Sequence, residues 1–585
     1  MACRRVLDVT NQDFLDELTA EDSFDEIYSY GSDDEFGDDL NVGDGNETDD
    51  SVESSDEEPL APGPWKTGSF EPIIPSFKPT MKPGPIASLR MDDPTPLDVF
   101  KLFVTESSVA GIVSETNTYA DSHYSDKEGC RRKRQWRPTT ACEMWAFLGL
   151  ILAMGMVKIG NIRDYWSTDN IFKHPFFPSV MPRDRFLDIL TFFHLNDNRN
   201  MARRGTIDFD PLFKVRPFLE TIKSRFQSLW YPYENIAVDE ATVAWRGNLS
   251  FRVFNKDKPD KYGIKIYEAC DSKNGYCLDF EVYSGKKIAS NKGATYDVVM
   301  RLISSFLHQG YTLFVDNFYT SPTLATDLLA KKTTLCGTVR LNRIGLDPSM
   351  KTKKTVKKKG DSRVMNNENI NHIKFMDNKE VNVLTTRHSD MKVDTGKLHK
   401  VTKEPITRFE AVHAYNQYMG AVDRSDQMVQ YAAFKRKTLK WWKKLFFHFF
   451  VLAEVNAYLW YKQYCINRSK KTMSHSNFRK ELAKALVSQV PNDNIAANPG
   501  VGESSLFRLK ARHFPSSIPK SITSSGQTER NRRRCHVCYV SIKKQQKSFF
   551  ECKACGVCLC IEPCFELYHT KCDFIKAYKK HHDVQ

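Results

Sequence analysis

Residues 235–284 read NIAVDEATVAWRGNLSFRVFNKDKPDKYGIKIYEACDSKNGYCLDFEVYS and decide the fold class. β-Branched and aromatic residues dominate this stretch, and Asn-Gly and Gly-Tyr steps divide it into pieces of strand length, which predicts three successive strands. The pattern of the following residues predicts a helix over 295–310, an apolar strand over 311–319, a helix over 321–332 and a strand over 333–340. This order predicts an α/β core with a mixed sheet.

The residues on both sides of this core have a helical pattern. Apolar residues recur near i, i+3, i+4 and i+7 over residues 93–232, and helices resume over 434–464. The longest apolar run, Met144 to Val157, is shorter than a membrane span and predicts a buried helix. Short β-like pieces and a lysine-rich run fill residues 343–409, which we interpret as an inserted domain.

Charge is strongly segregated along the 585 residues. Residues 1–58 hold 21 Asp and Glu against Arg4 and Arg5, a charge of about −19. Because the net charge of the whole chain is +13, residues 59–585 carry about +32. A body this basic favours a polyanionic partner such as nucleic acid. The acidic part and the Pro-rich part of residues 1–90 bury too little apolar surface to fold, which predicts a disordered tail.

Two aspartates follow apolar strands. Asp239 in IAVDEA and Asp316 in LFVDNF each stand where a buried run ends. A lone carboxylate in such a place must be neutralised, paired or bound to a metal. The ends of strands are also where α/β sheets place functional groups.

Two further carboxylates, Asp423 and Asp426, stand in AVDRSDQ near the start of an expected helix. One reading is local: Asp423 caps the helix and Asp426 faces the positive end of the helix dipole. The other is that Asp423 converges with Asp239 and Asp316. Carboxylates about 4 Å apart repel by roughly 4 kcal/mol at an effective dielectric of about 20, so the group would need a cation, and all-oxygen ligation favours Mg²⁺ or Mn²⁺.

A basic, aromatic segment, FKRKTLKWWKK, follows the third acid at residues 434–444. Cations can hold phosphates while an indole stacks on an unpaired base, so the segment is a candidate DNA contact. The alternative is that the tryptophans anchor the helix in the core, which we favour for Trp442 and leave open for Trp441. The candidate contacts are Lys435, Arg436, Lys437, Lys440, Trp441, Lys443 and Lys444.

Eight of the 15 cysteines crowd between Cys535 and Cys572. The N-terminus lacks the apolar region of a secretory signal, so we expect the scattered cysteines to be reduced and the crowded ones to bind metal. Two Cys-x₂-Cys pairs followed by more Cys and His are a strong zinc signal, and the flanking RNRRR and KAYKKHH favour a DNA ligand. The candidate zinc ligands are Cys535, Cys538, Cys552, Cys555, Cys560, Cys564, His569 and Cys572.

Four stretches closely resemble, in order, the piggyBac family of cut-and-paste DNA transposases and their domesticated derivatives. They are residues 235–276 of the opening sequence, LFVDNFYTSPTL, GTVRLNR and YNQYMGAVDRSDQ. The resemblance covers roughly residues 95–570. It implies an RNase H-like catalytic domain whose three essential aspartates match Asp239, Asp316 and Asp423, with Asp426 as a further required acid. It also implies nicking at transposon ends, a hairpin intermediate made by the freed 3′-OH, and integration at TTAA.

The resemblance extends to the cysteine-rich end, where family members carry a cross-braced pair of zinc ions that binds the terminal repeats. Seven of the eight candidate ligands match the family pattern. Cys558 and Cys572 depart from it, and Cys572 could supply an eighth ligand. By the same analogy, the protein is expected to be a homodimer that bridges two ends of double-stranded DNA, in the nucleus and not in a membrane.

The predicted function is therefore a metal-dependent DNA transposase. The alternatives are a domesticated, catalytically idle DNA-binding or chromatin protein, and a zinc-module peptide reader or ubiquitin ligase. The expected domains are a disordered tail (1–90), a helical dimerisation and DNA-binding domain (91–232 and 433–487), an RNase H-like core (233–342 and 410–432), the insertion (343–409), a linker (488–533) and a zinc-binding domain (534–585).

Overall fold

The computed structural model describes residues 64–86, 93–125, 136–256, 261–285, 289–352, 356–398, 403–436, 438–489, 513–522, 528–553, 555–571 and 573–583. The chain forms two compact units, Met1–Pro491 and Asn492–Gln585. The predicted disorder of residues 1–63 lies outside the described residues.

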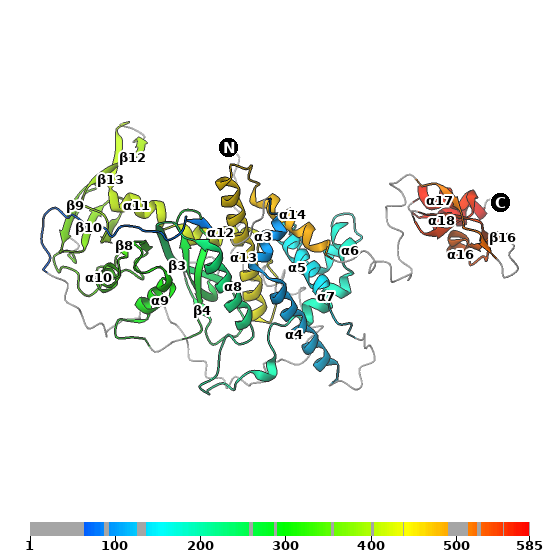
Figure 1. The fold of residues 1–585 in the computed structure, drawn as a ribbon, viewed down its shortest axis with the longest axis horizontal. Coiled ribbons are helices and arrows are strands. Elements are labelled where there is room, and N and C mark those ends of the chain that lie inside the picture. The colour runs from blue at the N-terminus through cyan, green and yellow to red at the C-terminus, as the bar shows by residue number, and fades with distance from the viewer. Residues whose placement is uncertain are drawn as a thin grey trace, which may run out of the picture. The chain divides into compact units, whose positions relative to one another are not determined.

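The first unit is built on a mixed nine-stranded sheet (Figure 1), in which the strands lie in the order β4-β5-β3-β7-β8-β11-β10-β9 and β6 pairs with β5. β3 is antiparallel to β5 and parallel to β7, which is parallel to β8. The α/β prediction is confirmed. The core strands are β3 (Asn235–Ala244), β4 (Val253–Phe254), β5 (Tyr262–Asp271), β6 (Cys277–Val282), β7 (Thr312–Val315) and β8 (Thr334–Thr338).

Two helices connect the parallel strands, as the sequence predicts. α9 (Ala294–Leu302) ends earlier than expected and is followed by the short turn η3 (Ser304–Phe306), while α10 (Pro322–Ala330) begins after Ser321, whose side chain accepts a hydrogen bond from the Leu324 amide. The fully buried residues of β7 explain its continuous apolar pattern, because a central parallel strand is covered on both faces.

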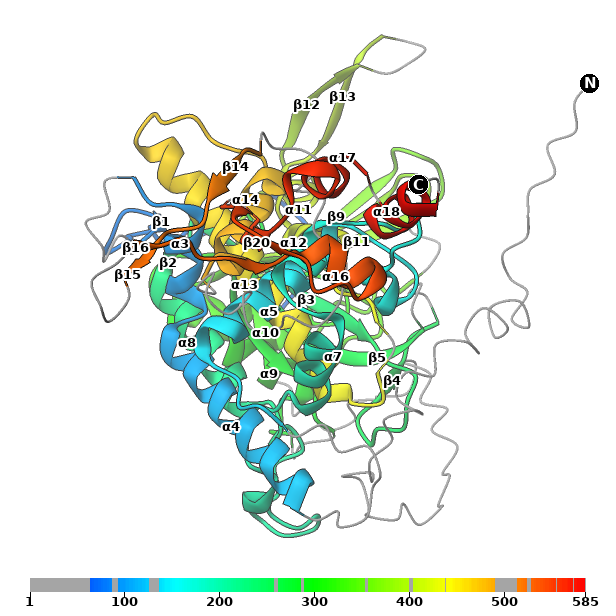
Figure 2. The ribbon, with the colours of Figure 1, turned by 90° about the vertical axis from the view of Figure 1, so that its right-hand side faces the viewer.

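The expected insertion does not form a separate sheet. β8 pairs with β11 (Glu380–Thr385), which pairs with β10 (Asn371–Met376) and through it with β9 (Ser362–Asn366), so this segment extends the core sheet. Only the hairpin of β12 (Lys392–Leu398) and β13 (Pro405–Phe409) pairs by itself, and it projects from the rest of the unit in Figure 2.

Helices cover the sheet, as the helical pattern predicts. The apolar run lies in α5 (Ala141–Met156), where twelve consecutive residues from Met144 to Gly155 are buried. None of the helices in the described ranges is both long and apolar enough to span a membrane. The other helices of this unit are α3 (Pro96–Phe103), α4 (Glu106–Ser125), α6 (Phe176–Val180), α7 (Arg183–Phe192), α8 (Arg216–Leu229), α11 (Glu410–Tyr418), α12 (Ala421–Ala432), α13 (Trp441–Asn467) and α14 (His475–Val487), with the turns η1 (Ile162–Trp166) and η2 (Asn198–Asn200).

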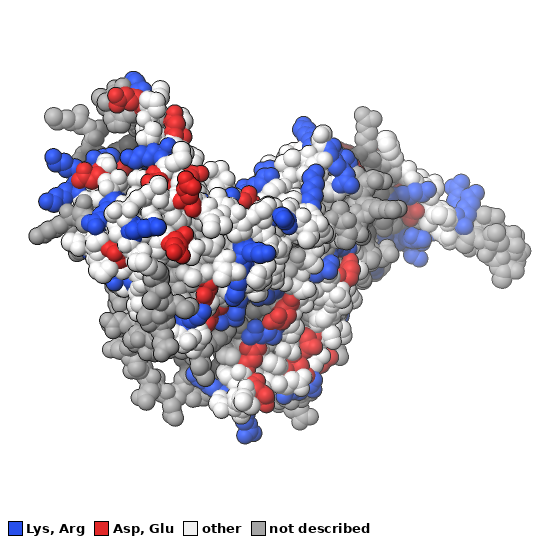
Figure 3. Space-filling model, turned by 60° about the vertical axis from the view of Figure 1, so that its left-hand side comes forward, with Lys and Arg blue, Asp and Glu red and all other residues white. Residues whose placement is uncertain are grey.

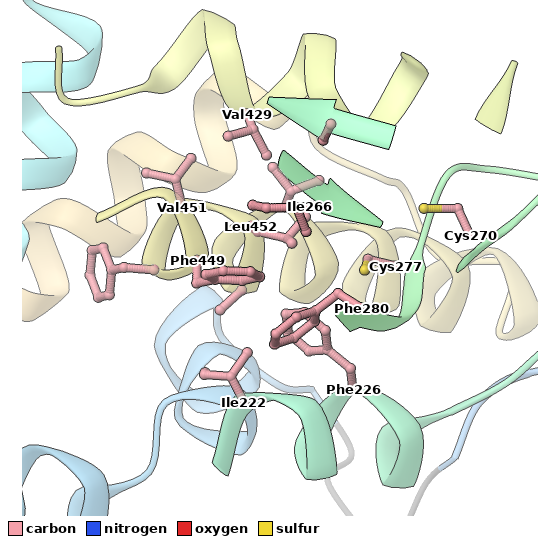
Figure 4. Packing of buried hydrophobic residues seen from close by; sticks show 14 of the residues in the cluster. Ile222, Phe226, Ile266, Cys270, Cys277, Phe280, Val429, Phe449, Val451 and Leu452 are labelled. Carbon is pink, nitrogen blue, oxygen red and sulfur yellow. The ribbon is translucent and has the colours of Figure 1, made fainter. Parts of the chain in front are cut away.

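α13 is the central helix of this layer. Its aromatic and aliphatic side chains pack against β5, β6, α8 and α12, and Figure 4 shows Phe449, Val451 and Leu452 beside Ile266 of β5 and Phe280 of β6. Phe280 and Phe449 lie 4.2 Å apart between ring centroids. This contact joins the helical layer to the edge of the sheet.

The predicted disorder of residues 1–90 is wrong for residues 64–86. This strap pairs with the sheet through Lys66 and Asn366, donates the Trp65 indole N–H to the Gly345 carbonyl at 3.0 Å, and ends in β1 (Gly84–Pro85) on β2 (Trp230–Tyr231). Although the strap is too short and Pro-rich to form its own core, it is ordered by backbone hydrogen bonds to other segments: Lys66 bonds to Asn366 of β9, Lys78 donates to the Gln309 carbonyl, and β1 pairs with β2.

The second unit is small and cysteine-rich. Its strands are β14 (Pro515–Ser517), β15 (Ser521–Ile522), β16 (Thr528–Glu529), β17 (Arg533–Arg534), β18 (Lys547–Ser548), β19 (Phe550–Cys552) and β20 (Val557–Cys558). Its helices are α16 (His536–Ile542), η5 (Ile561–Phe565), α17 (Glu566–Thr570) and α18 (Phe574–Asp583). Because β14 pairs with β19, this unit begins well before residue 534, the boundary expected from the sequence.

Candidate active site and zinc clusters

Asp239 and Asp316 lie side by side on adjacent parallel strands. Val238 of β3 is the partner of Val315 of β7, and each aspartate is the next residue. Contrary to expectation, the strand does not end at Asp239, because β3 continues to Ala244 against β5. Asp316 does follow the last residue of its strand.

Backbone amides fix both carboxylates. The Glu240 amide donates to Asp239 Oδ1 at 2.8 Å, and the Phe318 amide donates to Asp316 Oδ1 at 2.9 Å. These hydrogen bonds orient the two carboxylates at the inner strands β3 and β7 without neutralising their charge.

Burial and like charge raise the pKa of both carboxyl groups. Desolvation raises the pKa of Asp239 to about 8, with further repulsion from Glu240, Asp316 and Asp423. Desolvation and Glu240 raise the pKa of Asp316. Asp423 adds a smaller repulsion to Asp239, so the helix acid lies within electrostatic reach of the strand acids; that the three acids hold one metal stays a prediction.

The capping interpretation of Asp423 is wrong. Gly420 precedes α12, no side chain caps this end, and Asp423 lies within the first helical turn. Asp423 is exposed, so it is free to turn toward the strand acids. Asp426 lies one turn further along, accepts a hydrogen bond from Gln430 Nε2 at 3.3 Å, and repels buried Glu268 of β5. Asp426 therefore lies on the β5 side of the site.

Close packing fixes the position of α12. A Cβ on Gly155 of α5 would overlap the carbonyl oxygen of Ala432 at the end of α12. At the other end, Arg424 donates to the Ser272 carbonyl at 2.5 Å, and Gly275, with φ of 87°, brings the β5–β6 turn against Ala421. The helix that carries Asp423 is thus held at both ends.

The donor set fits a hard divalent cation. Asp239, Asp316 and Asp423 offer carboxylate oxygens, and burial together with the neighbouring acids raises the pKa of Asp239, a cost that a bound cation would relieve. The sequence reasoning missed Glu240 as a fifth acid of the site, although it follows Asp239 directly; the Tyr319 hydroxyl donates to its Oε2 at 3.1 Å.

Two arginines border the acids. Arg340 Nε donates to Asn317 Oδ1 at 3.0 Å, so this side-chain oxygen is hydrogen-bonded within the protein. The positive charge of Arg340 also lowers the pKa of Asp316. Arg343 donates to the Phe318 carbonyl. Both arginines stand in the motif GTVRLNR, but only the fold shows that they lie near Asp316.

The basic segment at residues 434–444 only partly faces solvent. Lys443 is buried and donates to the Leu190 and Thr191 carbonyls at 2.7 and 3.0 Å, which contradicts its predicted DNA contact. Arg436 donates to the Ile159 and Gly160 carbonyls at 2.6 and 2.5 Å and is committed to this loop. Long side chains of this kind can stabilise a fold through carbonyl groups that the sequence does not identify.

The other members of this segment differ from one another. Lys435 is exposed, Lys440 and Lys444 are half-buried, and Lys437 lies outside the described residues. Trp442 is buried, as favoured, whereas Trp441 is half-buried with its ring 5.3 Å from that of Phe251. Figure 3 shows Lys and Arg side chains interspersed with acids over one face of the described surface.

Four cysteines form the first metal-type cluster in the second unit. The Sγ atoms of Cys535, Cys538, Cys560 and Cys564 lie within 4.8 Å of one another. Hydrogen bonding from Cys564 lowers the pKa of Cys535 to about 5, so one sulfur is already a thiolate, the form that binds metal. Four sulfurs at this separation fit a tetrahedral zinc ion.

Two histidines and two cysteines form the second cluster: His513, Cys552, Cys555 and His569. His513 Nδ1 lies 3.4 Å from each of the two sulfurs. His569 Nδ1 lies 2.7 Å from the Phe565 carbonyl oxygen, to which it can donate, and this leaves Nε2 to face the cluster. The sequence reasoning missed His513, which stands 22 residues before the first Cys-x₂-Cys pair.

The two clusters resolve the partition that the sequence left open. The ligands of the two clusters alternate along the chain. His513 belongs to the second cluster, Cys535 and Cys538 to the first, Cys552 and Cys555 to the second, Cys560 and Cys564 to the first, and His569 to the second. This is a cross-braced arrangement. His513 completes the second cluster, the predicted ligand Cys572 lies outside the described residues, and Cys558 donates instead to the Arg533 and Ser548 carbonyls.

Comparison with known proteins gives consistent matches for both units. The family model described as "Transposase IS4" matches residues 95–458, and the "DDE_Tnp_1-like zinc finger" matches residues 517–570. The chain is 26% identical over 499 residues to human "PiggyBac transposable element-derived protein 3", covering 82% of this chain and 76% of that protein. It is 25% identical over 451 residues to human "PiggyBac transposable element-derived protein 5", covering 74% and 82%.

A solved structure matches the fold. The cryo-EM structure titled "piggyBac transposase synaptic complex with hairpin DNA" superposes with a TM-score of 0.64 at 24% identity, over 82% of this chain and 98% of that one.

Proposed function

The chain belongs to the piggyBac-type family of transposases, and we propose that it is an active, metal-dependent DNA transposase that cleaves transposon ends and joins them to target DNA. One observation carries the proposal: burial, together with repulsion from Glu240, Asp316 and Asp423, raises the pKa of Asp239 to about 8, so acids from β3, the end of β7 and α12 lie near one another. A protein that only bound DNA would gain nothing from this costly arrangement.

In this proposal Asp239, Asp316 and Asp423 hold Mg²⁺ or Mn²⁺. When bound, divalent ions activate the attacking water or 3′-OH and stabilise the leaving oxygen of an in-line displacement at phosphorus. Hydrogen bonds from the Glu240 and Phe318 backbone amides orient the two strand carboxylates that would hold the ion. Asp426 supports the site from the next turn of α12.

The surrounding residues act on the DNA. Arg340 and Arg343 border the acids and place positive charge beside Asp316, where a phosphodiester would otherwise be repelled. Exposed Lys435 and the half-buried Trp441 remain candidate contacts to the backbone and to an unpaired base.

We further propose the features that the family resemblance implies. They are an RNase H-like core, supported by the antiparallel run β6-β5-β3 followed by parallel β7 and β8; a hairpin intermediate; TTAA targets; and a nuclear homodimer that bridges two ends. We propose that the second unit binds two zinc ions and recognises terminal repeats, since its clusters have suitable donors and basic neighbours.

A plasmid excision assay with the terminal repeats that flank the coding sequence tests this function. We expect the full chain to excise the element and restore a single TTAA. Asp316→Asn should abolish excision but still bind the repeats, whereas Asp121→Asn, at an exposed residue of α4, should excise normally. Equal excision by Asp316→Asn and wild type would refute the carboxylate assignment.

The second candidate is a domesticated, idle DNA-binding protein, favoured by the similarity to human proteins named as transposable element-derived. It predicts repeat binding by the wild type without excision, hairpin or strand transfer in Mg²⁺ or Mn²⁺. That result would replace the enzyme proposal and leave the DNA-binding part intact.

A further inference from the structure

A third group of metal-type donors lies in the core of the first unit beside the carboxylate site, since Glu268 of β5 is the cross-strand partner of Asp239. Glu268 and Cys270 of β5 and Cys277 of β6 place a carboxylate oxygen and two sulfurs within 4.8 Å of one another. All three residues are buried, with exposed fractions of 1% or less.

Strand geometry brings these donors to one place. Glu268 and Cys270 are two residues apart on β5, so their side chains lie on the same face of the sheet. Cys270 is the cross-strand partner of Cys277, and the register shifts between Ala269 and Cys270. Figure 4 shows Cys270 and Cys277 next to each other at one side of the packing between the sheet and α13.

α13 supplies a fourth donor. His448 is buried, and its Nε2 lies 4.0 Å from Glu268 Oε1, beyond hydrogen-bonding distance. Within the described residues this nitrogen has no hydrogen-bond partner. This nitrogen lies beside Glu268, one of the three clustered donors, and folding disfavours a buried ring nitrogen without a hydrogen bond.

Ordinary packing explains the thiols but not their neighbours. Two buried cysteines can pack as small apolar groups. Among the described residues no Lys or Arg pairs with Glu268. Its carboxylate accepts from the Cys270 thiol at 3.9 Å and lies 4.0 Å from His448 Nε2, so a cation bound among these groups would compensate a buried carboxylate that is only weakly paired.

The backbone around the donors is rigid. Asn456 of α13 accepts from the Cys277 amide at 3.0 Å and donates to the Cys277 carbonyl at 2.9 Å, so one side chain fixes both polar groups of that residue. Glu268 is repelled by Asp426, which places the cluster behind α12. A metal here would join β5, β6 and α13 beneath the helix that carries Asp423.

We propose that Glu268, Cys270, Cys277 and His448 bind a third zinc ion, which supports the catalytic helix from inside the core. Two thiolates, an imidazole and a carboxylate select a borderline cation of the zinc class over Mg²⁺, which prefers oxygen donors. The role is structural, because the site is closed by buried side chains and offers no position to a substrate.

Zinc stoichiometry of the purified full chain tests the proposal. We expect three zinc ions per wild-type chain by elemental analysis. The double variant Cys538→Ser and Cys555→Ser, which disables both C-terminal clusters, should keep one. The double variant Cys270→Ser and Cys277→Ser should keep two, and the control Cys336→Ser, at a buried cysteine outside the cluster, should keep three.

Two zinc ions in the wild type, or three in the Cys270→Ser and Cys277→Ser variant, would overturn the proposal. If this variant does not fold, the wild type still decides the question after exchange into ¹¹³Cd²⁺. Three cadmium resonances support the site if one of them has the shift of a two-sulfur site and persists in the Cys538→Ser and Cys555→Ser variant. The absence of that resonance from the variant refutes the proposal.

Discussion

Neutralising Asp239 should stabilise the metal-free protein while it removes catalysis. In the folded chain the carboxyl keeps its proton up to a pKa of about 8, against the usual 3.8. The unfolded chain therefore binds fewer protons than the folded chain between these pH values, and folding stability falls as pH rises through this window. Asp239→Asn carries no charge in either state and avoids this loss.

The size of the effect follows from the shift. About four pH units correspond to at most ~6 kcal/mol at ~1.4 kcal/mol per unit. Because Asp239 is partly exposed and water screens its charge, we expect about 3 kcal/mol at pH 8. In a unit with roughly 400 ordered residues, each adding ~2.1 cal/mol/K to the entropy of unfolding, this raises Tm by about 4 °C.

Thermal unfolding of the full chain with a chelator measures this directly. The gain in Tm of Asp239→Asn over wild type should grow from pH 5 to pH 8. Mg²⁺ should raise the Tm of wild type at pH 8 and close most of the difference, because the cation relieves the repulsion only where all the carboxylates are present. Asp121→Asn serves as the control and should change neither value.

The reasoning is refuted if Asp239→Asn is less stable than wild type at pH 8 in chelator. It is also refuted if Mg²⁺ raises the Tm of both proteins equally, since the ion would then bind elsewhere.

Three further predictions concern the same sites. Asp423→Asn should reduce end cleavage at least 10²-fold, and Asp426→Asn by a smaller factor, because only Asp423 is coupled to Asp239; equal losses would contradict this ranking. Gly155→Ala should lower Tm and cleavage together by displacing the end of α12, a 1–3 kcal/mol effect typical of overpacking, readable by calorimetry beside the cleavage assay. His513→Ala should remove one zinc ion and weaken binding to the terminal repeat, as elemental analysis and gel shift would report. Cys558→Ser should keep the wild-type zinc content and the wild-type binding to the repeat.

The sequence predicted the parts of the fold that depend on local pattern. β7 is a short apolar run with Asp316 at its end, and the order of strands and helices from residue 235 to 340 followed from composition. The extension of the sheet by β9 to β11 could not be predicted, because edge pairing depends on which strand is left open, and the short β-like pieces do not encode that.

The sequence proposes the acids of the site but not the residues that surround them. Asp239, Asp316 and Asp423 were identified through motifs, but the roles of Arg436 and Lys443 depend on carbonyl groups from residues more than 240 positions away. His513 gave no spacing signal, since a stretch read as linker separates it from the cysteines. The one available signal was numerical: seven matched ligands leave one tetrahedral position open.

The late position of α12 affects synthesis of the protein. Asp239 and Asp316 precede the segment that extends the sheet, and Asp423 follows it, so a nascent or truncated chain that ends before residue 421 carries two of the three converging acids. Such a fragment cannot surround a divalent ion with all three carboxylates. The proposed transposase therefore gains its third metal-binding acid only after almost three quarters of the chain has been made.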